Sequence, residues 1–379
     1  MYRTFLICSV AFAAYGPFLA TYITAEIGGA SLFSVVLPYL FAILSLLTRK
    51  VSNYVGLIYL SVSFILGTIF AFLRSVVFEE QFLNLLFSTW AIWSLTVLGL
   101  LASQKFYFTK ALEKKFFTFV LLSLCLLHTM NSFLFTQKVI WINNGFDNSG
   151  YEILWGRFRG VLGGANIQGV YNAYLFYCLW KLLNTKLHWA LIIWMIALVS
   201  VLPTVSRGGL LVLLIMLIDI FKSSSFRHKV YLGMAVIMFS VYGIDALSEL
   251  SIAQRFSTGE ITSGRLDKTS YFFSLLGSDG LFILFGIPRN LQVSGVQLSD
   301  NSFTAMFASY GIIIFLWYYA LKYLRKQNNT QWRTNLFMLS VFCVLFLNNA
   351  YIWVPWLFLI VPFLIFSHSH ENIINKSQS

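Results

Sequence analysis

The chain has 379 residues, of which 58% are hydrophobic and only 11% are charged. A soluble globular domain carries about 25% charged residues, and apolar runs of roughly the 20 residues needed for one membrane span recur along the whole chain, so these features exclude a soluble protein. The net charge of +12 would suggest nucleic acid in a soluble protein. Here it follows the excess of Lys and Arg on the cytoplasmic side of membrane proteins, and we expect no nucleic-acid partner.

The apolar runs, taken in chain order, predict an all-α, polytopic integral membrane protein with about 12 transmembrane helices. The first run is interpreted as a span rather than a removed signal peptide, because no clear small-residue cleavage site follows it. The expected spans are 4–24, 30–48, 53–73, 82–102, 116–136, 161–183, 187–205, 207–221, 229–249, 302–321, 333–349 and 352–367. We expect residues 1–379 to form a single membrane domain.

Basic residues follow every second expected span and set the predicted orientation. Clusters of Lys and Arg occur after spans two, four, six, eight and ten, from Arg49–Lys50 to Arg325–Lys326. Because cytoplasmic loops carry the excess of Lys and Arg, both termini are expected in the cytoplasm. The outer side then holds one large extracytoplasmic loop, 250–301, which at about 50 residues is long enough to be functional.

Arginine dominates the basic residues of the predicted outer side. That side holds seven Arg and two Lys, whereas the inner side holds five Arg and 12 Lys. Topology alone disfavours both residue types outside, and the planar guanidinium group binds phosphate through two hydrogen bonds at once. The bias indicates an anionic ligand such as a diphosphate. Snorkelling or ion pairing with outer carboxylates is the alternative, above all for Arg74 and Arg289.

Three motifs lie at predicted helix N-termini on the outer side: RFRGVLGGANIQG at 157–169, SRGGLLVLLIMLI at 206–218 and DNSFTAMFASYG at 300–311. Helix N-termini present free N–H groups and a positive dipole end, which together favour anions. Ser206 is expected to cap its helix. Gly208 and the glycine after it leave room for a ligand near the backbone. Close packing against a neighbouring helix is the alternative for each glycine.

The large loop is expected to contain a short helix from about Ser263 to Leu276, lying at the membrane interface with its apolar side chains toward lipid or the bundle. This helix would bring Arg265 near the headgroup of a lipid-linked substrate, with a structural flap as the alternative. The four Cys sit singly in apolar runs, and no His or Cys pair with metal-ligand spacing occurs on the outer side. We therefore expect neither a metal nor another cofactor.

The SRGG stretch at 206–209, followed by its apolar run, resembles the signature of the O-antigen polymerase and O-antigen ligase superfamily. The spacing of Arg157, Gly160 and Asn166 is similar to an earlier motif of that family. Ser263–Arg265 and the pair Asp300–Asn301 before a span also resemble it. The resemblance implies a glycosyltransferase of the bacterial cytoplasmic (inner) membrane, with its active site on the periplasmic or extracellular side.

Within that superfamily, polymerases transfer a growing glycan from its lipid diphosphate onto a new lipid-linked repeat unit, and ligases transfer finished glycan to lipid A core. Ligases resemble one another in a His just before an Asn, where this chain has Asp300 before Asn301. The difference favours a polymerase that joins undecaprenyl-diphosphate-linked oligosaccharides into O-antigen, capsule or exopolysaccharide. The expected partners are this lipid-linked oligosaccharide and the bilayer, with a chain-length regulator protein as a further candidate.

The expected chemistry is metal-independent glycosyl transfer, in which arginines stabilise the charge that develops on the diphosphate and a carboxylate takes the acceptor proton. The expected catalytic residues are Arg207, Arg265, Asp300 and Arg157. The expected substrate-binding residues are Arg159, Asn166, Ser206, Gly208, Arg255, Arg289 and Asn301. Other candidates for the base are Glu260, Asp267 and Glu152. Candidates for stacking on sugars are Tyr151, Trp155, Tyr171 and Tyr174, with lipid or interfacial packing as the alternative.

Three other classes of protein remain as alternatives. A transporter or flippase predicts charges in the middle of spans, inverted repeats and broken helices, and mid-span charges are nearly absent here. A peptidoglycan polymerase of the shape-and-division type would share the outer-face chemistry, but its motifs are not seen. A structural membrane scaffold would leave the arginine bias unexplained.

Overall fold

The structure is a computed structural model that describes residues 2–23, 26–27, 30–48, 54–86, 89, 111–137, 158–162, 164–183, 185–222, 265–288, 291 and 307–313. Its contacts divide the chain into two compact units. Unit 1 contains the described residues up to Val120 and from Lys268 onward, and unit 2 contains those from Leu121 to Asp267. Regular structure in the described ranges is helical except for one pair of two-residue strands, which agrees with the expected all-α class. The single membrane domain, 1–379, and the loop at 250–301 stay predictions.

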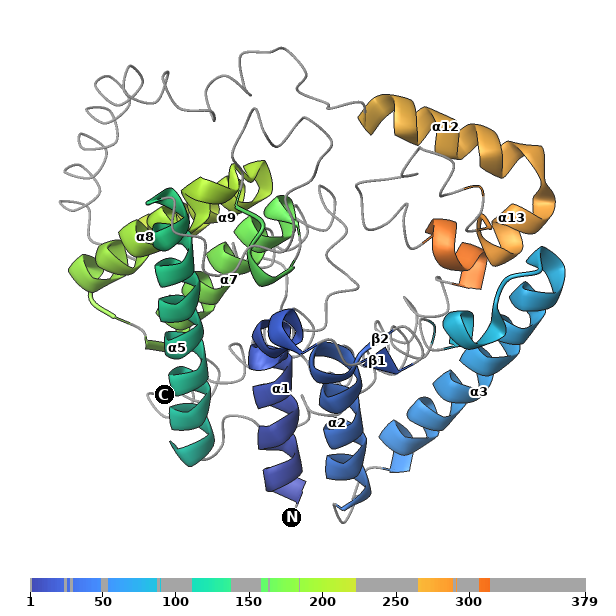
Figure 1. Ribbon diagram of the computed structural model, residues 1–379, viewed down its shortest axis with the longest axis horizontal. Coiled ribbons are helices and arrows are strands. Elements are labelled where there is room, and N and C mark those ends of the chain that lie inside the picture. Colours follow the sequence, from blue (N-terminus) through green and yellow to red (C-terminus); the bar gives the residue numbers. More distant parts are fainter. Residues whose placement is uncertain are drawn as a thin grey trace, which may run out of the picture. The chain divides into compact units, whose positions relative to one another are not determined.

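Unit 1 begins with a hairpin of two apolar helices, α1 and α2, which lie side by side (Figure 1). Its elements are α1 (Tyr2–Tyr22), the antiparallel strands β1 (Glu26–Ile27) and β2 (Ala30–Ser31), the π-helical η1 (Leu32–Val36) and α2 (Leu37–Leu47). Gly16 lets the two backbones approach closely, since a Cβ there would lie 2.9 Å from the Cα of Ser34. The buried Ser9 hydroxyl donates to the carbonyl of Pro38 at 2.7 Å, so the hairpin satisfies this polar group internally.

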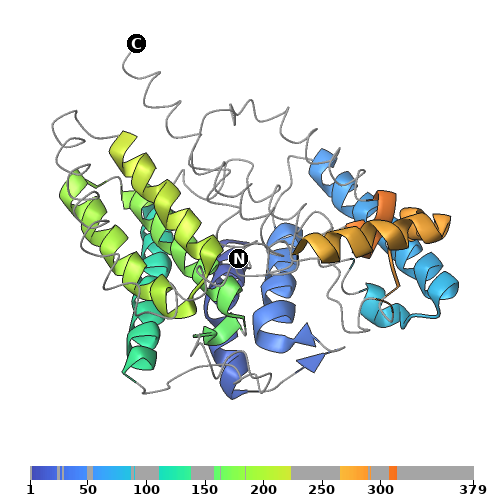
Figure 2. The same ribbon diagram turned by 90° about the horizontal axis from the view of Figure 1, so that it is seen from above.

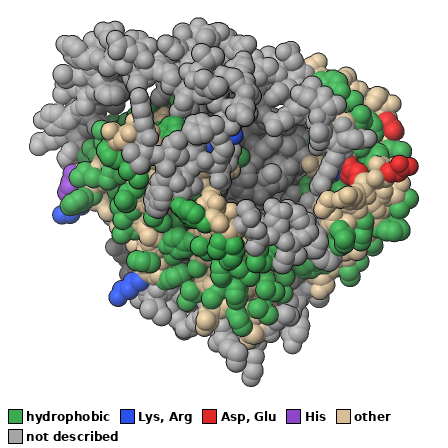
Figure 3. Space-filling view, in the orientation of Figure 1, with side chains coloured by type: hydrophobic (Ala, Val, Ile, Leu, Met, Phe, Trp, Pro, Cys, Tyr) green, Lys and Arg blue, Asp and Glu red, His purple; other side chains and the backbone are tan. Residues whose placement is uncertain are grey.

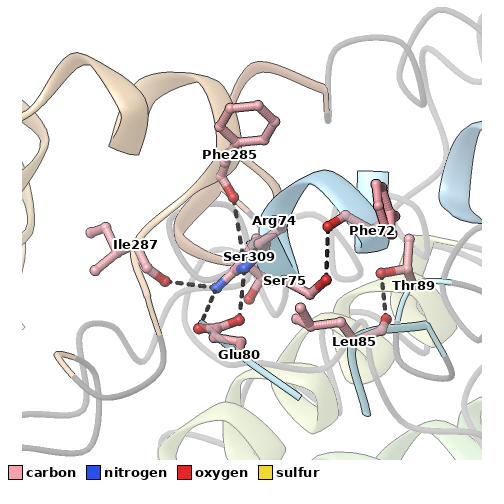
Figure 4. Close-up of polar contacts among 9 residues, drawn as sticks. All are labelled: Phe72, Arg74, Ser75, Glu80, Leu85, Thr89, Phe285, Ile287 and Ser309. Carbon is pink, nitrogen blue, oxygen red and sulfur yellow. Dashed lines mark hydrogen bonds and ion pairs between the residues drawn. The ribbon is translucent and has the colours of Figure 1, made fainter. Parts of the chain in front are cut away.

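Arg74, near the C-terminal end of α3 (Tyr54–Phe78), joins that helix to Glu80 and to the backbone at 285–287 and 309 (Figure 4). Its Nε and Nη2 donate to the Glu80 carboxylate at 3.0 and 3.3 Å. Nη1 and Nη2 also donate to the backbone carbonyls of Phe285 (3.1 Å), Ile287 (2.9 Å) and Ser309. All five N–H groups of the guanidinium are therefore used, and the side chain is only 2% exposed. A buried charge is tolerated when it is paired and hydrogen-bonded in this way.

The carbonyls that Arg74 binds come from the end of the predicted outer loop and from the span that follows it. The helix expected at 263–276 is present as α12 (Arg265–Ser278), and the short α13 (Gly280–Phe285) comes next. A buried cluster joins these helices to the following span and contains Phe272, Phe282, Ile287 and Ala308. Phe273, in contrast, is 61% exposed. Some apolar side chains of α12 thus pack inside unit 1, and others face outward.

Unit 2 contains four long helices in its described part, and α7, α8 and α9 lie beside one another in both views (Figures 1 and 2). The helices are α5 (Ala111–Thr136), most of which belongs to this unit, α7 (Ala165–Leu183), α8 (Leu187–Val201) and α9 (Arg207–Lys222), with the 3-10 turns η2 (Gly160–Leu162) and η3 (Leu202–Thr204). Gly169 of α7 lies against Gly209 of α9 near the N-terminal ends of both helices. The hydroxyl of Tyr177 in α7 donates to Asp219 in α9 near their C-terminal ends, so the two helices run parallel. The expected break between spans seven and eight is confirmed at η3.

The helices of unit 2 bury several polar side chains and expose many large apolar ones. On α5, Leu126 and Met130 are each 56% exposed, whereas His128 and Asn131 are buried. On α8, Met195 is exposed and the polar Ser200 is buried. On the face drawn in Figure 3, hydrophobic side chains cover most of the described surface, and charged side chains are few. The outward faces of these helices therefore differ from those on a soluble protein, which are polar.

Two helical stretches, Lys115–Thr136 and Leu187–Thr204, are long and apolar enough to cross a membrane. They coincide with the expected spans five and seven. The other ten spans of the expected set are not established and stay predictions. Three of them, 229–249, 333–349 and 352–367, lie entirely outside the described residues.

The saturated guanidinium predicts that Arg74→Met destabilises the protein strongly, because it leaves a buried Glu80 carboxylate without its counter-ion and three carbonyls without donors. The expected loss is about 3–5 kcal/mol in the free energy of unfolding. Ser75→Ala is the matched control, since Ser75 is the next residue, is only partly buried, and its hydroxyl bonds within α3, to Phe72. It should change stability by less than about 0.5 kcal/mol. Thermal unfolding in detergent measures both, and equal melting temperatures would contradict this role of Arg74.

Candidate functional site

The N-terminal ends of α7 and α9 meet at two glycines. A Cβ on Gly209 would lie 2.7 Å from the carbonyl oxygen of Gly169, and a Cβ on Gly169 would overlap Thr204 and Ser206. Only glycine permits so close a crossing of backbones. The packing alternative is therefore correct for Gly209. Gly208 is buried as well, and the expected approach of a ligand to its backbone stays a prediction.

Ser206 caps α9, as the sequence predicts. Its Oγ accepts the N–H of Gly209 at 3.2 Å and donates to the carbonyl oxygen of Asn166 at 3.1 Å. Because Asn166 lies in the first turn of α7, this one buried hydroxyl joins the N-terminal ends of both helices. Arg207 follows directly as the first residue of α9 and is partly buried.

The turn before Ser206 is strained. Val205 has a φ of 50° and a ψ of 37°, the left-handed conformation, which costs of order 1–3 kcal/mol and is unusual for a β-branched residue. Its N–H donates to the carbonyl of Leu202 at 3.0 Å, which holds the turn closed. Strained residues of this kind concentrate at functional sites. Here the strained residue sets the direction in which α9, and with it Arg207, begins.

A third segment, around η2, is attached to the same place. The N–H of Phe158 donates to the carbonyl of Pro203 at 2.9 Å. The N–H of Leu162 donates to the side-chain oxygen of Gln168 in α7 at 3.3 Å. Arg159, between these two bonds, is partly buried. The turn that carries Arg159 is therefore fixed at one end to η3 and at the other end to α7.

These three segments form what we call the junction: the turn 158–162, the start of α7 at 164–169 and the turn 202–209. Five of the eleven predicted site residues lie on it: Arg159, Asn166, Ser206, Arg207 and Gly208. Arg265 is the first residue of α12, where only its backbone is described. The remaining predicted residues lie outside the described ranges, and their roles stay predictions: Arg157, Arg255, Arg289, Asp300 and Asn301.

A chain of hydrogen-bonded, buried polar side chains begins at Gln168 of the junction and was not predicted from the sequence. Gln168 Nε2 donates to Asn172 Oδ1 at 2.6 Å and lies 2.9 Å from His128 Nδ1. Asn172 Nδ2 donates to the hydroxyl and the carbonyl of Ser200 at 2.9 and 3.1 Å, and Ser132 donates to the same carbonyl at 3.0 Å. A signal was present: Gln168 and Asn172 are four residues apart, hence on one face of an otherwise apolar helix.

Two of the candidates for sugar stacking are packed inside unit 2. Tyr171 and Tyr174 are 2% and 0% exposed. The ring of Tyr171 meets that of His128 edge to face, with centroids 5.5 Å apart. Burial of both rings favours the packing alternative for them. Tyr151 and Trp155 lie outside the described residues.

Two other basic residues form ion pairs that involve no residue of the junction. Arg74, one of the outer arginines that indicated an anionic ligand, is bonded to Glu80 and to backbone carbonyls, so ion pairing is the correct explanation for it. Lys181 pairs with Asp219 at 2.7 Å, at the ends of α7 and α9 that lie farthest from the junction. Among the described residues, no three side chains of His, Cys, Asp or Glu are grouped so that they could hold a metal. The expected lack of a cofactor stays a prediction.

Comparisons of the chain with models of protein families, with curated proteins and with solved structures found no match. The resemblance to the O-antigen polymerase and ligase superfamily therefore rests on the motifs at 157–169, 206–209, 263–265 and 300–301 alone.

The helix crossing predicts that Gly169→Ala destabilises the protein, because its Cβ would push α7 away from the turn that carries Ser206. The expected cost is about 1–3 kcal/mol. Gly277→Ala is the matched control, since Gly277 also lies in a helix and a Cβ there would meet nothing within 4 Å; it should be neutral or stabilising by up to about 1 kcal/mol. Thermal unfolding of the two purified variants measures the difference, and a stable Gly169→Ala protein would mean that the crossing is not tight.

Proposed function

We propose that this chain is a multi-pass protein of the bacterial cytoplasmic membrane. Two observations support the proposal: two helical stretches have the length and apolar composition of spans, and the helices of unit 2 expose many large apolar side chains while several polar ones are buried. In lipid, apolar side chains face outward at little cost, whereas every polar group needs a partner within the protein. The chain from His128 through Gln168 and Asn172 to Ser200 provides such partners.

We further propose that the chain is a membrane glycosyltransferase that polymerises undecaprenyl-diphosphate-linked oligosaccharide repeat units at the outer face of that membrane. The observation that carries this proposal is the junction, which joins the turn of Arg159 to the N-terminal ends of α7 and α9, where Arg207 begins its helix. Neither 157–169 nor 201–209 contains an Asp or a Glu. Positive charge and helix N-termini together favour a bound anion such as a diphosphate.

The proposed reaction breaks the bond between the anomeric carbon of the growing glycan and its lipid diphosphate. A hydroxyl oxygen of the incoming repeat unit forms the new bond to that carbon, and its proton passes to a carboxylate. The diphosphate leaves with the bonding electrons, so negative charge develops on it, and Arg207 and Arg159 would stabilise this charge. The candidates for the base are Asp300, Glu260, Asp267 and Glu152.

This function predicts that Arg207→Ala abolishes long polysaccharide while the protein still inserts into the membrane. Loss of one donor that stabilises developing charge lowers the rate by roughly 10²–10³-fold. Lys222→Ala is the matched control, because Lys222 is the last residue of the same helix, at its other end. The glycan profile on a gel compares a deletion strain complemented with the native chain, with Arg207→Ala or with Lys222→Ala. Normal chain lengths with Arg207→Ala would remove that residue from the mechanism.

The uncomplemented deletion strain separates the alternative functions. Single repeat units on lipid A core or on the lipid carrier would support the polymerase. Full-length polymer that stays on its carrier would identify a ligase instead. A glycan profile unchanged in every respect would overturn the glycosyltransferase proposal, and transport of a polysaccharide or lipid should then be measured.

A further inference from the structure

Gln168 occupies the centre of the contacts between the junction and the interior of unit 2. Its side chain is fully buried, and its two polar ends point to different parts of the structure. The oxygen Oε1 accepts the N–H of Leu162, in the turn that carries Arg159. The nitrogen Nε2 contacts Asn172 of α7 and His128 of α5. Gln168 therefore connects the arginine-bearing turn to two helices.

The hydrogen bonds of Gln168 leave its amide a single orientation. Nε2 carries two hydrogens, one directed to Asn172 Oδ1 at 2.6 Å and the other to His128 Nδ1 at 2.9 Å. His128 Nδ1 must then be the acceptor, so this nitrogen carries no hydrogen. With the nitrogen fixed by these two acceptors, Oε1 has to face the turn. The contacts with Asn172 and His128, which do not involve the turn of Arg159, therefore set the orientation of the amide.

The turn is shaped to receive this side chain. Gly160 has a φ of +59°, the left-handed region that favours glycine, and a Cβ on it would overlap the amide of Gln168. The side chain thus fills the space that a larger residue at 160 would occupy. Arg159 directly precedes this glycine, and Leu162 follows it by two residues. The position of the arginine backbone therefore depends on the buried amide.

We infer that Gln168 is a positioning residue, which holds the turn at 158–162 so that Arg159 is presented to the diphosphate of the donor. This inference rests on the proposed function for the role of Arg159. Gln168 acts through the turn and touches no reacting atom. A polar residue that only joined helices would not need Oε1 bonded to the turn; its contacts to Asn172 and His128 would be enough. The bond to Leu162 is the observation that separates the two roles.

The first test is hydrogen exchange of the amides in the turn, followed by mass spectrometry of the protein in lipid nanodiscs. In Gln168→Met, which is close in volume and has no polar end, exchange in a peptide covering 158–162 should accelerate at least about 10-fold. Ser132→Ala is the control, because Ser132 is an equally buried polar residue whose hydroxyl bonds to the carbonyl of Ser200 rather than to Gln168 or the turn. It should leave exchange in that peptide unchanged. Equal exchange in Gln168→Met and native protein overturns the inference.

Gln168→Asn is a second variant that keeps the amide and shortens it by one carbon, so that the oxygen no longer reaches Leu162. If Gln168→Met fails to fold, Gln168→Asn tests the inference in its place. It should accelerate hydrogen exchange in the peptide covering 158–162 in the same way. Slow exchange in Gln168→Asn would overturn the inference just as it would in the Met variant.

The second test is a double-mutant cycle on the purified enzyme with lipid-linked repeat units. Gln168→Asn should raise KM for the donor and lower kcat/KM by about 10- to 100-fold, as expected for a misplaced binding group. In an Arg159→Ala background the same change should cost less than about 3-fold, because the residue through which it acts is already absent. Additive losses would overturn the link to Arg159. If the native enzyme forms no polymer, the proposed function and the role of Gln168 in it both fail, while exchange still reports whether Gln168 holds the turn.

Discussion

The close crossing of α7 and α9 at Gly169 and Gly209 is the contact on which the rest of the junction depends. With a larger residue at either position, the backbones would separate, and the hydroxyl of Ser206 could not reach the carbonyl of Asn166 at 3.1 Å while accepting the N–H of Gly209. That hydroxyl holds the first turn of α7 beside the first turn of α9. The parallel arrangement of α7 and α9 follows, and it brings both N-terminal dipole ends to the same end of the bundle.

In each unit one buried polar side chain uses all the hydrogens of its donor groups. Arg74 uses all five of its N–H groups, and the amide of Gln168 uses both of its nitrogen-bound hydrogens. In an apolar environment an unsatisfied group costs free energy comparable to a lost hydrogen bond, so such networks have one arrangement of lowest energy rather than several. The consequence for function is rigidity: a turn or helix end held by a saturated buried group keeps one geometry. A site that binds developing charge benefits from this, because its groups need not reorganise during the reaction.

The sequence predicted the local elements well and their cross-contacts poorly. Apolar runs located the helices, the Pro203–Ser206 break and the cap at Ser206, since these depend on neighbouring residues. The partner of Arg74 was not predicted, although Glu80 is only six residues away, and neither were the carbonyls of Phe285 and Ile287, which are more than 200 residues away in sequence. For the same reason the role of Gln168 was not predicted, although its spacing from Asn172 placed both amides on one face of the helix. Its importance comes from Leu162 and from His128 of another helix, and neither contact leaves a periodic signal in the chain.

The structure distinguishes arginines that the sequence composition cannot tell apart. Arg74 lies beside the Glu80 carboxylate, and its hydrogen bonds all go to that carboxylate and to backbone carbonyls. Arg159 and Arg207 are held on segments that contain no Asp or Glu, at a place where two helix N-termini also present positive dipole ends. In the function proposed above, the negative charge on the donor diphosphate grows as the glycosyl bond breaks. Arginines and helix N-termini held in this way would then bind the transition state more tightly than the intact donor.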